Sequence, residues 1–358
     1  MIRVGLVGYG LAGSVFHAPL ITAVEGFELA AVVERSGRRA EAVYPGIVTY
    51  PSLSAMLTDP SLELIVVATP DNQHVEHASE ALEASRHVIV DKPVANTTAE
   101  IAGLMALAAD AGRFLIPFHN RRWDSDFRTI QKLLLEQSIG RVVSLESTFD
   151  RWRPHPAPAK WREDGSTPGG VLTNLGPHLV DQALVLFGPP EAVGAEVRTE
   201  RDGSLAIDAF TLRLHYPRLT VTLGSNYLAA QPRPRFNIRG TRGGFVKRGL
   251  DPQEERLREA GRVVEPDWGA EQASAWGMLA VEPQGSPGAG NSMVTYPLAS
   301  IPGDYRLYYA GVRDAILGKA EPPVLAIDAW RVAQILEWAV ESSEKRAEIA
   351  CDWSNEPR

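Results

Sequence analysis

Two residues of this sequence carry side chains suited to moving a proton, Lys92 and His178. Lys92 ends the apolar run HVIVDKP (87–93), and an ammonium at a strand end can hydrogen-bond an oxygen on which negative charge develops. His178 lies in VLTNLGPHLVDQALVLFG, and an imidazole with a pKa near 6.5 exchanges protons in both directions at neutral pH. A surface lysine and a core histidine are the structural alternatives, and both stay open.

The segment around His178 places three polar residues at helical spacing. Asn174, His178 and Asp181 would lie on one face of a helix. Because proline fits only the first turn of a helix, Pro177 predicts a helix that starts just after Asn174, with Asn174 as its N-cap. Asp181 would either hold His178 or lie on the helix surface.

A glycine pattern near the start of the chain predicts a second site. Gly8, Gly10 and Gly13 have G-x-G-x-x-G spacing, directly after a predicted strand and before a predicted helix. Gly8 would permit the tight turn, Gly10 the approach of a pyrophosphate, and Gly13 the close packing of helix on strand. The N–H groups at the helix N-terminus would bind the phosphates. We expect a bound dinucleotide here rather than a purely structural turn.

The end of the next predicted strand bears on which dinucleotide binds. Glu34 lies about 20 residues after the last glycine, where a carboxylate can accept hydrogen bonds from the adenosine ribose. It favours NAD, because it would repel the 2′-phosphate of NADP. Arg35 and Arg38 could bind that phosphate instead, so NADP is not excluded.

The elements that position these residues form two regions, and the first spans residues 1–121. Short apolar runs alternate there with helical patterns, which is typical of a parallel sheet covered by helices on both faces. We therefore predict an α/β domain with a doubly wound sheet of the Rossmann type. Its strands are expected in 2–8, 28–34, 62–69, 87–93 and 113–119.

The second region, residues 122–358, has a different pattern. A bridging helix is expected at 124–137, and alternating runs between 141 and 240 predict a large, open, mostly antiparallel sheet. Two further helices are expected at about 304–318 and 326–346. Residues 249–300 are rich in Gly, Pro, Glu and Trp and predict a long excursion with little regular structure. We expect an α+β domain.

Composition restricts the possible partners and location. The net charge of −8 disfavours nucleic acid and anionic membranes, and no apolar run approaches the roughly 20 residues that span a bilayer. Cys351 is the only cysteine, and the N-terminus lacks a signal-peptide pattern, so we expect a cytoplasmic protein. His74 and His77 have no third ligand nearby, so no metal is expected.

Several motifs together resemble one known family, the Gfo/Idh/MocA oxidoreductases, and most closely its scyllo-inositol dehydrogenase branch. They are VGYGLAGSVFHAPLI, ATPDNQHVEHASEAL, VIVDKPVANTTAE, FHNRRWDSDF and GPHLVDQALVLFG. The resemblance implies NAD(P)-dependent hydride transfer between nicotinamide and a polyol, inositol or sugar-like alcohol or ketone. It also implies that the second domain binds substrate and joins the subunits of a homodimer or homotetramer through its sheet.

The resemblance also implies roles for individual residues. Lys92 matches the catalytic lysine of the family's E-K-P motif, with Asp91 in place of Glu. Asn174 stands where the family commonly has Asp, which leaves His178 and Lys92 to carry the proton transfer. The expected substrate-binding residues are Lys92, Arg122, Trp161, Asn174 and His178. The expected cofactor-binding residues are Gly8, Tyr9, Gly10, Leu11, Ala12, Gly13, Glu34, Arg35, Thr69, Pro70, Asn72, His74, Asp91, Lys92, Asn120 and Arg121.

Two other functions fit the same sequence. A non-catalytic dinucleotide-binding sensor would have the same fold, although the retention of Lys92 and His178 argues against it. A reductase of a non-sugar carbonyl, an imine or a bilin-like ring would use the same residues. Arg151, Trp152 and Trp161 offer forked donors and aromatic faces that suit a sugar, but Trp–Arg stacking is equally common on surfaces.

Overall fold

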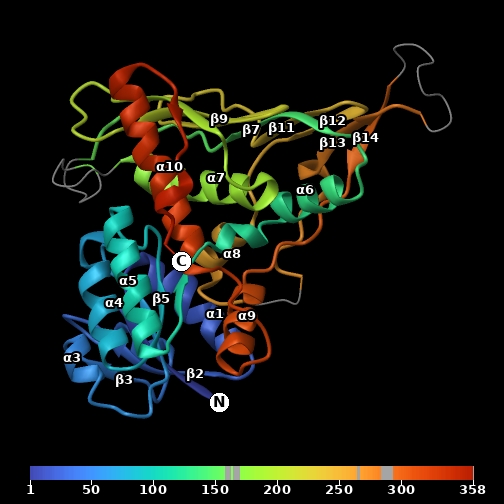
Figure 1. The fold of residues 1–358 in the computed structure, drawn as a ribbon. Coiled ribbons are helices and arrows are strands. Elements are labelled where there is room, and N and C mark those ends of the chain that lie inside the picture. Colours follow the sequence, from blue (N-terminus) through green and yellow to red (C-terminus); the bar gives the residue numbers. More distant parts are fainter. Residues whose placement is uncertain (158–162, 164–169, 264–266, 284–292, 358) are drawn as a thin grey trace.

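The computed structural model describes residues 1–157, 163, 170–263, 267–283 and 293–357. Within them the chain forms two lobes, each built on one sheet (Figure 1). One sheet has six strands and the other has nine. The predicted fold class, a Rossmann-type sheet followed by an α+β domain, is confirmed.

The first sheet is parallel, and its strands run in the order β3-β2-β1-β4-β5-β6. Apart from the edge strand β3, its strands are almost wholly buried apolar runs, as expected in a sheet covered on both faces. The order reverses between β1 and β4, where open α/β sheets bind their ligands at the carboxyl ends of the strands. The strands are β1 Ile2–Val7, β2 Phe27–Val33, β3 Val48–Tyr50, β4 Leu64–Val67, β5 His87–Val90 and β6 Leu115–Pro117.

Helices connect these strands. The glycine turn after β1 leads into a short π-helix, η1 (Ala12–His17), which continues as α1 (Ala18–Ala23). The longest helix of this lobe, α5 (Thr98–Ala111), begins with a capping box in which Thr97 and Glu100 satisfy each other's backbone N–H groups. The others are α2 Arg39–Val43, α3 Leu53–Met56, η2 Asp71–Gln73 and α4 His74–Glu83.

The second sheet has the strand order β14-β13-β12-β11-β7-β10-β9-β8-β15. Among the described strands of this second sheet, only β7 and β10 pair in parallel. The prediction of a mostly antiparallel sheet is therefore confirmed. The strands are β7 Val142–Thr148, β8 Ala192–Arg198, β9 Ala209–Tyr216, β10 Leu219–Asn226, β11 Phe236–Gly240, β12 Gly243–Lys247, β13 Gly277–Val281, β14 Val294–Leu298 and β15 Ile349–Ala350.

The prediction of little regular structure over 249–300 is wrong. The segment contains α8 (Gln253–Ala260) and the strands β13 and β14, which extend the sheet beyond β12. Each of these strands is only five residues long and lies among Gly and Pro. Each strand pairs its backbone groups with those of the preceding strand. This pairing could not be predicted because the local sequence does not indicate which strand lies beside it.

Helices cover one face of this sheet (Figure 1). They are α6 (Ser125–Leu135), α7 (Val171–Phe187) and α10 (Ala326–Lys345). The 3-10 turns η4 (Ala273–Ala275) and η5 (Trp353–Asn355) complete the lobe. No helix in the described part of the chain is long and apolar enough to cross a membrane.

Helix α7 starts earlier than the sequence predicted. It begins at Val171, with Gly170 as N-cap at a φ of 89°, a conformation that glycine adopts at little cost. Asn174 is therefore the fourth helical residue rather than the cap, and Pro177 lies inside the helix. An internal proline costs one backbone hydrogen bond. Burial of Leu172, Leu175 and Pro177 against neighbouring elements stabilises the helix in spite of it.

The two lobes share a core near their junction. Helix α9 (Arg306–Ile316) packs beside α1 of the first lobe (Figure 1). Tyr308 is fully buried and donates a hydrogen bond to the carbonyl of Pro117 at 3.1 Å, while the Tyr309 hydroxyl lies 2.7 Å from His17 Nδ1. A boundary between residues 121 and 122 therefore separates the two sheets, but the C-terminal part of the chain returns to complete the first core.

Candidate active site

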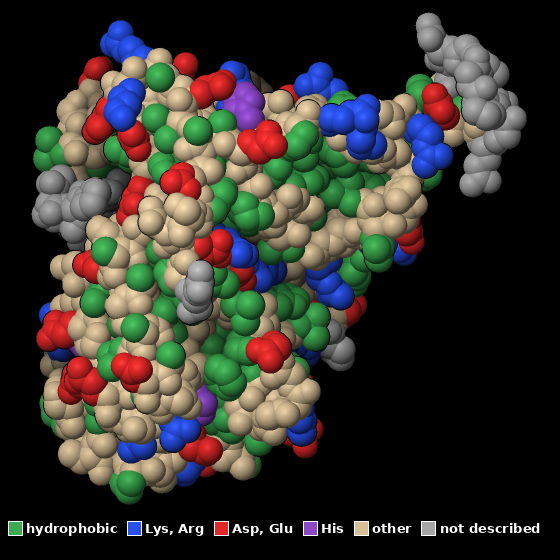
Figure 2. All heavy atoms as spheres, in the orientation of Figure 1, with side chains coloured by type: hydrophobic (Ala, Val, Ile, Leu, Met, Phe, Trp, Pro, Cys, Tyr) green, Lys and Arg blue, Asp and Glu red, His purple; other side chains and the backbone are tan. Residues whose placement is uncertain are grey.

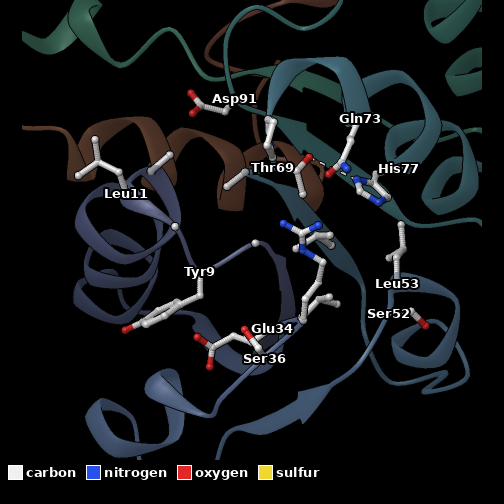
Figure 3. Close-up of a pocket in the computed structure, with 18 of the residues that line it drawn as sticks. Tyr9, Leu11, Glu34, Ser36, Ser52, Leu53, Thr69, Gln73, His77 and Asp91 are labelled. Carbon is white, nitrogen blue, oxygen red and sulfur yellow. Dashed lines mark hydrogen bonds between the residues drawn. The ribbon is translucent and has the colours of Figure 1, made fainter. Parts of the chain in front are cut away.

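A groove runs along the carboxyl ends of the first sheet's strands (Figure 3). Ten of the expected cofactor-binding residues line it, namely Gly8, Tyr9, Gly10, Leu11, Ala12, Glu34, Arg35, Thr69, Pro70 and Asp91. Ten further residues that line it were not assigned by the sequence analysis, namely Val7, Val33, Ser36, Arg39, Pro51, Ser52, Leu53, Ala68, Gln73 and His77. Arg39, Leu53, Gln73 and His77 lie in the short helices that follow the strands.

The three glycines of the turn differ in their surroundings. Gly8 has a φ of +97°, and a Cβ there would lie 2.9 Å from the carbonyl oxygen of Ala68. A Cβ on Gly13 would lie only 2.1 Å from the carbonyl oxygen of Gly8, so this position fixes the approach of helix and turn. A Cβ on Gly10 would have no atom within 4 Å, and Gly10 lines the groove. The turn therefore fits a dinucleotide pyrophosphate, with Gly10 as the point of approach.

Glu34 is buried at the adenosine end of the groove. Its side chain is 2% exposed, and its two oxygens accept hydrogen bonds from Arg39 Nε and the N–H of Ala40, both at 3.2 Å. Arg39 also donates to the carbonyl of Tyr9 at 2.7 Å, and its side chain is 68% exposed. Arg38 instead pairs with Glu41. The arginine beside the carboxylate is thus Arg39, which the sequence analysis did not single out.

Four expected cofactor residues, Asn72, His74, Asn120 and Arg121, do not line the groove. The ring nitrogens of His74 lie 2.7 Å from the Pro93 carbonyl and 2.9 Å from the Thr69 carbonyl, so the ring ties the β4 loop to the segment after Lys92. Asn120 is buried in η3 (Asn120–Trp123), and Asn72 is exposed in η2. Arg121 is buried and pairs with Asp124 and Glu254.

Lys92 and His178 come together from different lobes. Lys92 follows β5, and its Nζ donates hydrogen bonds to the Asn174 carbonyl at 2.8 Å and to Asn174 Oδ1 at 3.1 Å. His178 lies one helical turn further along α7 and is 6% exposed, with Nδ1 buried and without a hydrogen-bond partner among the described residues. Burial, and then the positive charge of Lys92, lower the pKa of His178 well below its usual value. Burial and charge at this position therefore favour the neutral imidazole over the imidazolium.

Asp181, the third residue of the expected helical face, pairs with Arg122. Asp181 is buried, and its carboxylate receives Arg122 Nε at 3.0 Å and Nη2 at 2.6 Å, while the same Nη2 donates to Asp328 at 2.9 Å. Although burial opposes it, Arg122 lowers the pKa of Asp181. Asp181 thus neither holds His178 nor lies on the surface. Arg122, expected to bind substrate, instead joins η3, α7 and α10.

Trp161, expected to bind substrate, lies outside the described residues. The described residues contain no group of three or more His, Cys, Asp and Glu side chains placed to hold a metal ion.

Comparison with known proteins agrees with this architecture. Residues 2–119 match the model "Oxidoreductase family, NAD-binding Rossmann fold", and residues 131–350 match "Oxidoreductase family, C-terminal alpha/beta domain". The chain belongs to the Gfo/Idh/MocA oxidoreductase family. The family resemblance inferred from the motifs is confirmed.

Relatives of this family align over nearly the full chain. The oxidoreductase YdgJ of Escherichia coli is 42% identical, covering 97% of this chain and 98% of its own. The scyllo-inositol 2-dehydrogenase (NADP(+)) IolW of Bacillus subtilis is 36% identical, covering 97% and 95%. Among solved structures, the putative oxidoreductase yvaA of Bacillus subtilis has a TM-score of 0.93 at 35% identity, covering 98% of this chain and 99% of its own.

The glycine turn gives a first prediction. Gly13→Ala should lower the free energy of unfolding by about 1–3 kcal/mol, because its Cβ would overlap backbone that is fixed on both sides. Gly10→Ala should unfold like the parent, whereas Gly10→Val should weaken dinucleotide binding at least tenfold. Chemical denaturation and calorimetry measure the two effects. Parent-like stability of Gly13→Ala, or parent-like binding by Gly10→Val, would contradict this assignment.

His178 gives a second prediction. A histidine that acts as a base must be neutral, so it works above its own pKa and fails below it. Because the pKa of His178 is lowered, kcat/KM for alcohol oxidation should stay level from pH 8 to about 6.5 and fall only at lower pH. Asn174→Asp should move this limb upward, because a carboxylate stabilises the imidazolium. His178→Ala should cost about 10² to 10⁴ in rate.

His215→Ala is the matched control for this prediction, since His215 lies on β9 beside Glu348 in the second sheet. It should leave rate and pH profile unchanged. Near-normal turnover of His178→Ala with the same pH limb would assign the base to another residue.

Proposed function

We propose that the chain transfers a hydride between a nicotinamide dinucleotide and the CH–OH carbon of a polyol, inositol or sugar-like alcohol, or the corresponding ketone. The observation that carries this proposal is the contact between Lys92 and Asn174. It brings the end of the dinucleotide groove within one helical turn of His178. The scyllo-inositol dehydrogenase among the relatives supports the same class of substrate.

The side chains supply the proton chemistry that alcohol oxidation needs. A bound nicotinamide would accept the hydride. Lys92 would hydrogen-bond the reacting oxygen and stabilise negative charge on it. His178, neutral because burial and nearby cations disfavour the imidazolium, would take the hydroxyl proton. Asn174 would orient the hydroxyl without adding charge.

The test is turnover with a panel of alcohols. Purified protein should reduce the nicotinamide cofactor, followed by its absorbance, with at least one of several inositols, hexitols and aldoses. Lys92→Ala should lower kcat by about 10² to 10³. Lys319→Ala, at an exposed lysine, should not. Tight dinucleotide binding with no turnover on any alcohol, aldose or ketone would favour the sensor function instead.

We further propose that the groove prefers NADP. The expectation that Glu34 favours NAD requires a free carboxylate, and this one pairs with Arg39 and accepts a hydrogen bond from the N–H of Ala40. Arg35, Ser36 and Arg39 line the groove around it, and cations and donors of this kind suit a 2′-phosphate. The B. subtilis relative is an NADP enzyme by its name.

Arg39→Gln should therefore weaken NADP binding at least tenfold, since it removes a guanidinium from the 2′-phosphate, and change NAD binding no more than about threefold. Arg38→Gln is the matched control, because Arg38 pairs with Glu41 and is 74% exposed. Calorimetric titration of the parent and of both variants with each dinucleotide gives the six dissociation constants. Tighter binding of NAD than of NADP by the parent protein would show this preference to be wrong.

A further inference from the structure

A second cavity lies at the end of β7, beside the start of β11 and helix α8. Among the described residues, six arginines and four carboxylates line it. Figure 2 shows basic side chains gathered at the waist of the molecule, where the two lobes meet. The arginines that line the cavity therefore outnumber its carboxylates by two.

Most of the arginines are matched within the protein. Arg233 donates two hydrogen bonds to Asp150, both at 2.8 Å. Glu254 accepts from Arg121 at 2.6 Å and from Arg258 at 2.7 Å, and although burial opposes it, these cations lower its pKa to about 2. The remaining buried one, Arg235, donates to Ser147 and Gln182 and lies 3.5 Å from Asp126.

Arg151 is different. Its guanidinium lies 5.1 Å from the centre of the Phe149 ring, and it has no ion pair or side-chain hydrogen bond to any residue the structure describes. Its backbone N–H is fixed by a hydrogen bond to the Asn226 carbonyl at 3.0 Å. Burial, and then the charge of Arg153, lower the pKa of the guanidinium, although an arginine stays charged in a protein. Glu254 partly offsets this effect, but its carboxylate already pairs with Arg121 and Arg258. Arg151 therefore has no carboxylate of its own among the described residues, and a partly buried cation in this position favours a negative ligand.

Arg248 adds a second cation at the rim of the cavity. Its side chain is exposed, and it has no ion pair within the described part of the chain. Glu255 is exposed at the same rim and leaves the net charge of the lining residues positive. Arg248 and Arg151 thus both add positive charge to the cavity.

The inner wall of this cavity reaches the helix that carries His178. Gln182, one turn after His178 on α7, donates to the Arg121 carbonyl at 2.9 Å and accepts from Arg235 Nη2 at 2.7 Å. Arg121 and Arg235 are also among the cations that lower the pKa of His178. The cavity and the proposed base are thus neighbours.

We propose that this cavity binds an anionic group of the substrate, so that the enzyme acts on a polyol or sugar bearing a carboxylate or a phosphate, held by Arg151. A guanidinium fork matches either group through two parallel hydrogen bonds. The inference rests on the proposed dehydrogenase function, because it takes the cavity as the substrate site of that reaction.

The test compares matched pairs of ligands that differ in charge. D-gluconate is paired with D-sorbitol, and myo-inositol 1-phosphate with myo-inositol, each titrated calorimetrically into the protein. The anionic member of at least one pair should bind at least tenfold more tightly than its neutral partner. The pair that shows this preference distinguishes carboxylate from phosphate.

Variants assign the preference to the site. Arg151→Gln should reduce the preference for the anionic ligand at least tenfold. Arg151→Lys should keep part of that preference, because the positive charge remains but the forked pair of donors is lost. Arg218→Gln, at an exposed arginine between β9 and β10, is the control and should change nothing. If Arg151→Gln fails to fold, Arg248→Gln and Arg151→Lys carry the test, each with a measurable loss. Equal binding within both pairs, or a preference that survives these variants, would overturn the proposal.

The outcome is separable from that of the proposed function. Turnover of neutral polyols with no anion preference would keep the dehydrogenase and reject the anionic substrate. Anion binding that depends on Arg151, without cofactor reduction on any alcohol, would keep the site and reject the dehydrogenase.

Discussion

An ion cluster of the buried Asp181 with the partly buried Arg122 and Asp328 holds the candidate active site together. It links the segment after β6 with α7 and α10, and α7 is the helix that carries both Asn174 and His178. Buried charges are tolerated only when each is paired with good geometry. The relative position of β5 and α7, on which the contact between Lys92 and Asn174 depends, is therefore constrained by residues that do not themselves face the groove.

The site created in this way is strongly cationic. Lys92, Arg121 and Arg235 all lie near His178, and His119 adds to their effect on its pKa. Such an environment disfavours a protonated histidine and stabilises negative charge on a reacting oxygen. Burial and this arrangement of charges together favour a neutral His178, and the same charges are what the proposed anionic ligand would meet.

The returning C-terminal segment has a related role. Tyr305, Tyr308 and Tyr309 are fully buried against the first lobe, and the Tyr305 hydroxyl donates to Asp124 at 2.7 Å. Asp124 also pairs with Arg121. The packing that completes the first core therefore orients a residue of the basic cavity, so the stability of the first lobe and the geometry of the second are coupled.

The sequence by itself determined the parts of this protein that depend on local pattern. Continuous apolar runs predicted the parallel strands, and the glycine spacing predicted a turn in which Gly8, Gly10 and Gly13 have the expected steric roles. Lys92 and His178 could be selected because few side chains exchange or stabilise protons and these two follow recognisable motifs.

Only the tertiary structure decided how the charges are matched. The run ERSGRR offers several arginines, and the fold of α2 places Arg39, rather than Arg38, beside Glu34. Asp181 and Arg122 are far apart in the chain, so nothing in either segment predicts their pairing. Strands β13 and β14 and the early start of α7 depend likewise on partners distant in sequence. The pattern of apolar residues in a sequence indicates which face of a helix or strand is buried. Ion pairs and strand pairing depend instead on which elements lie side by side, and the packing of the whole chain determines that arrangement.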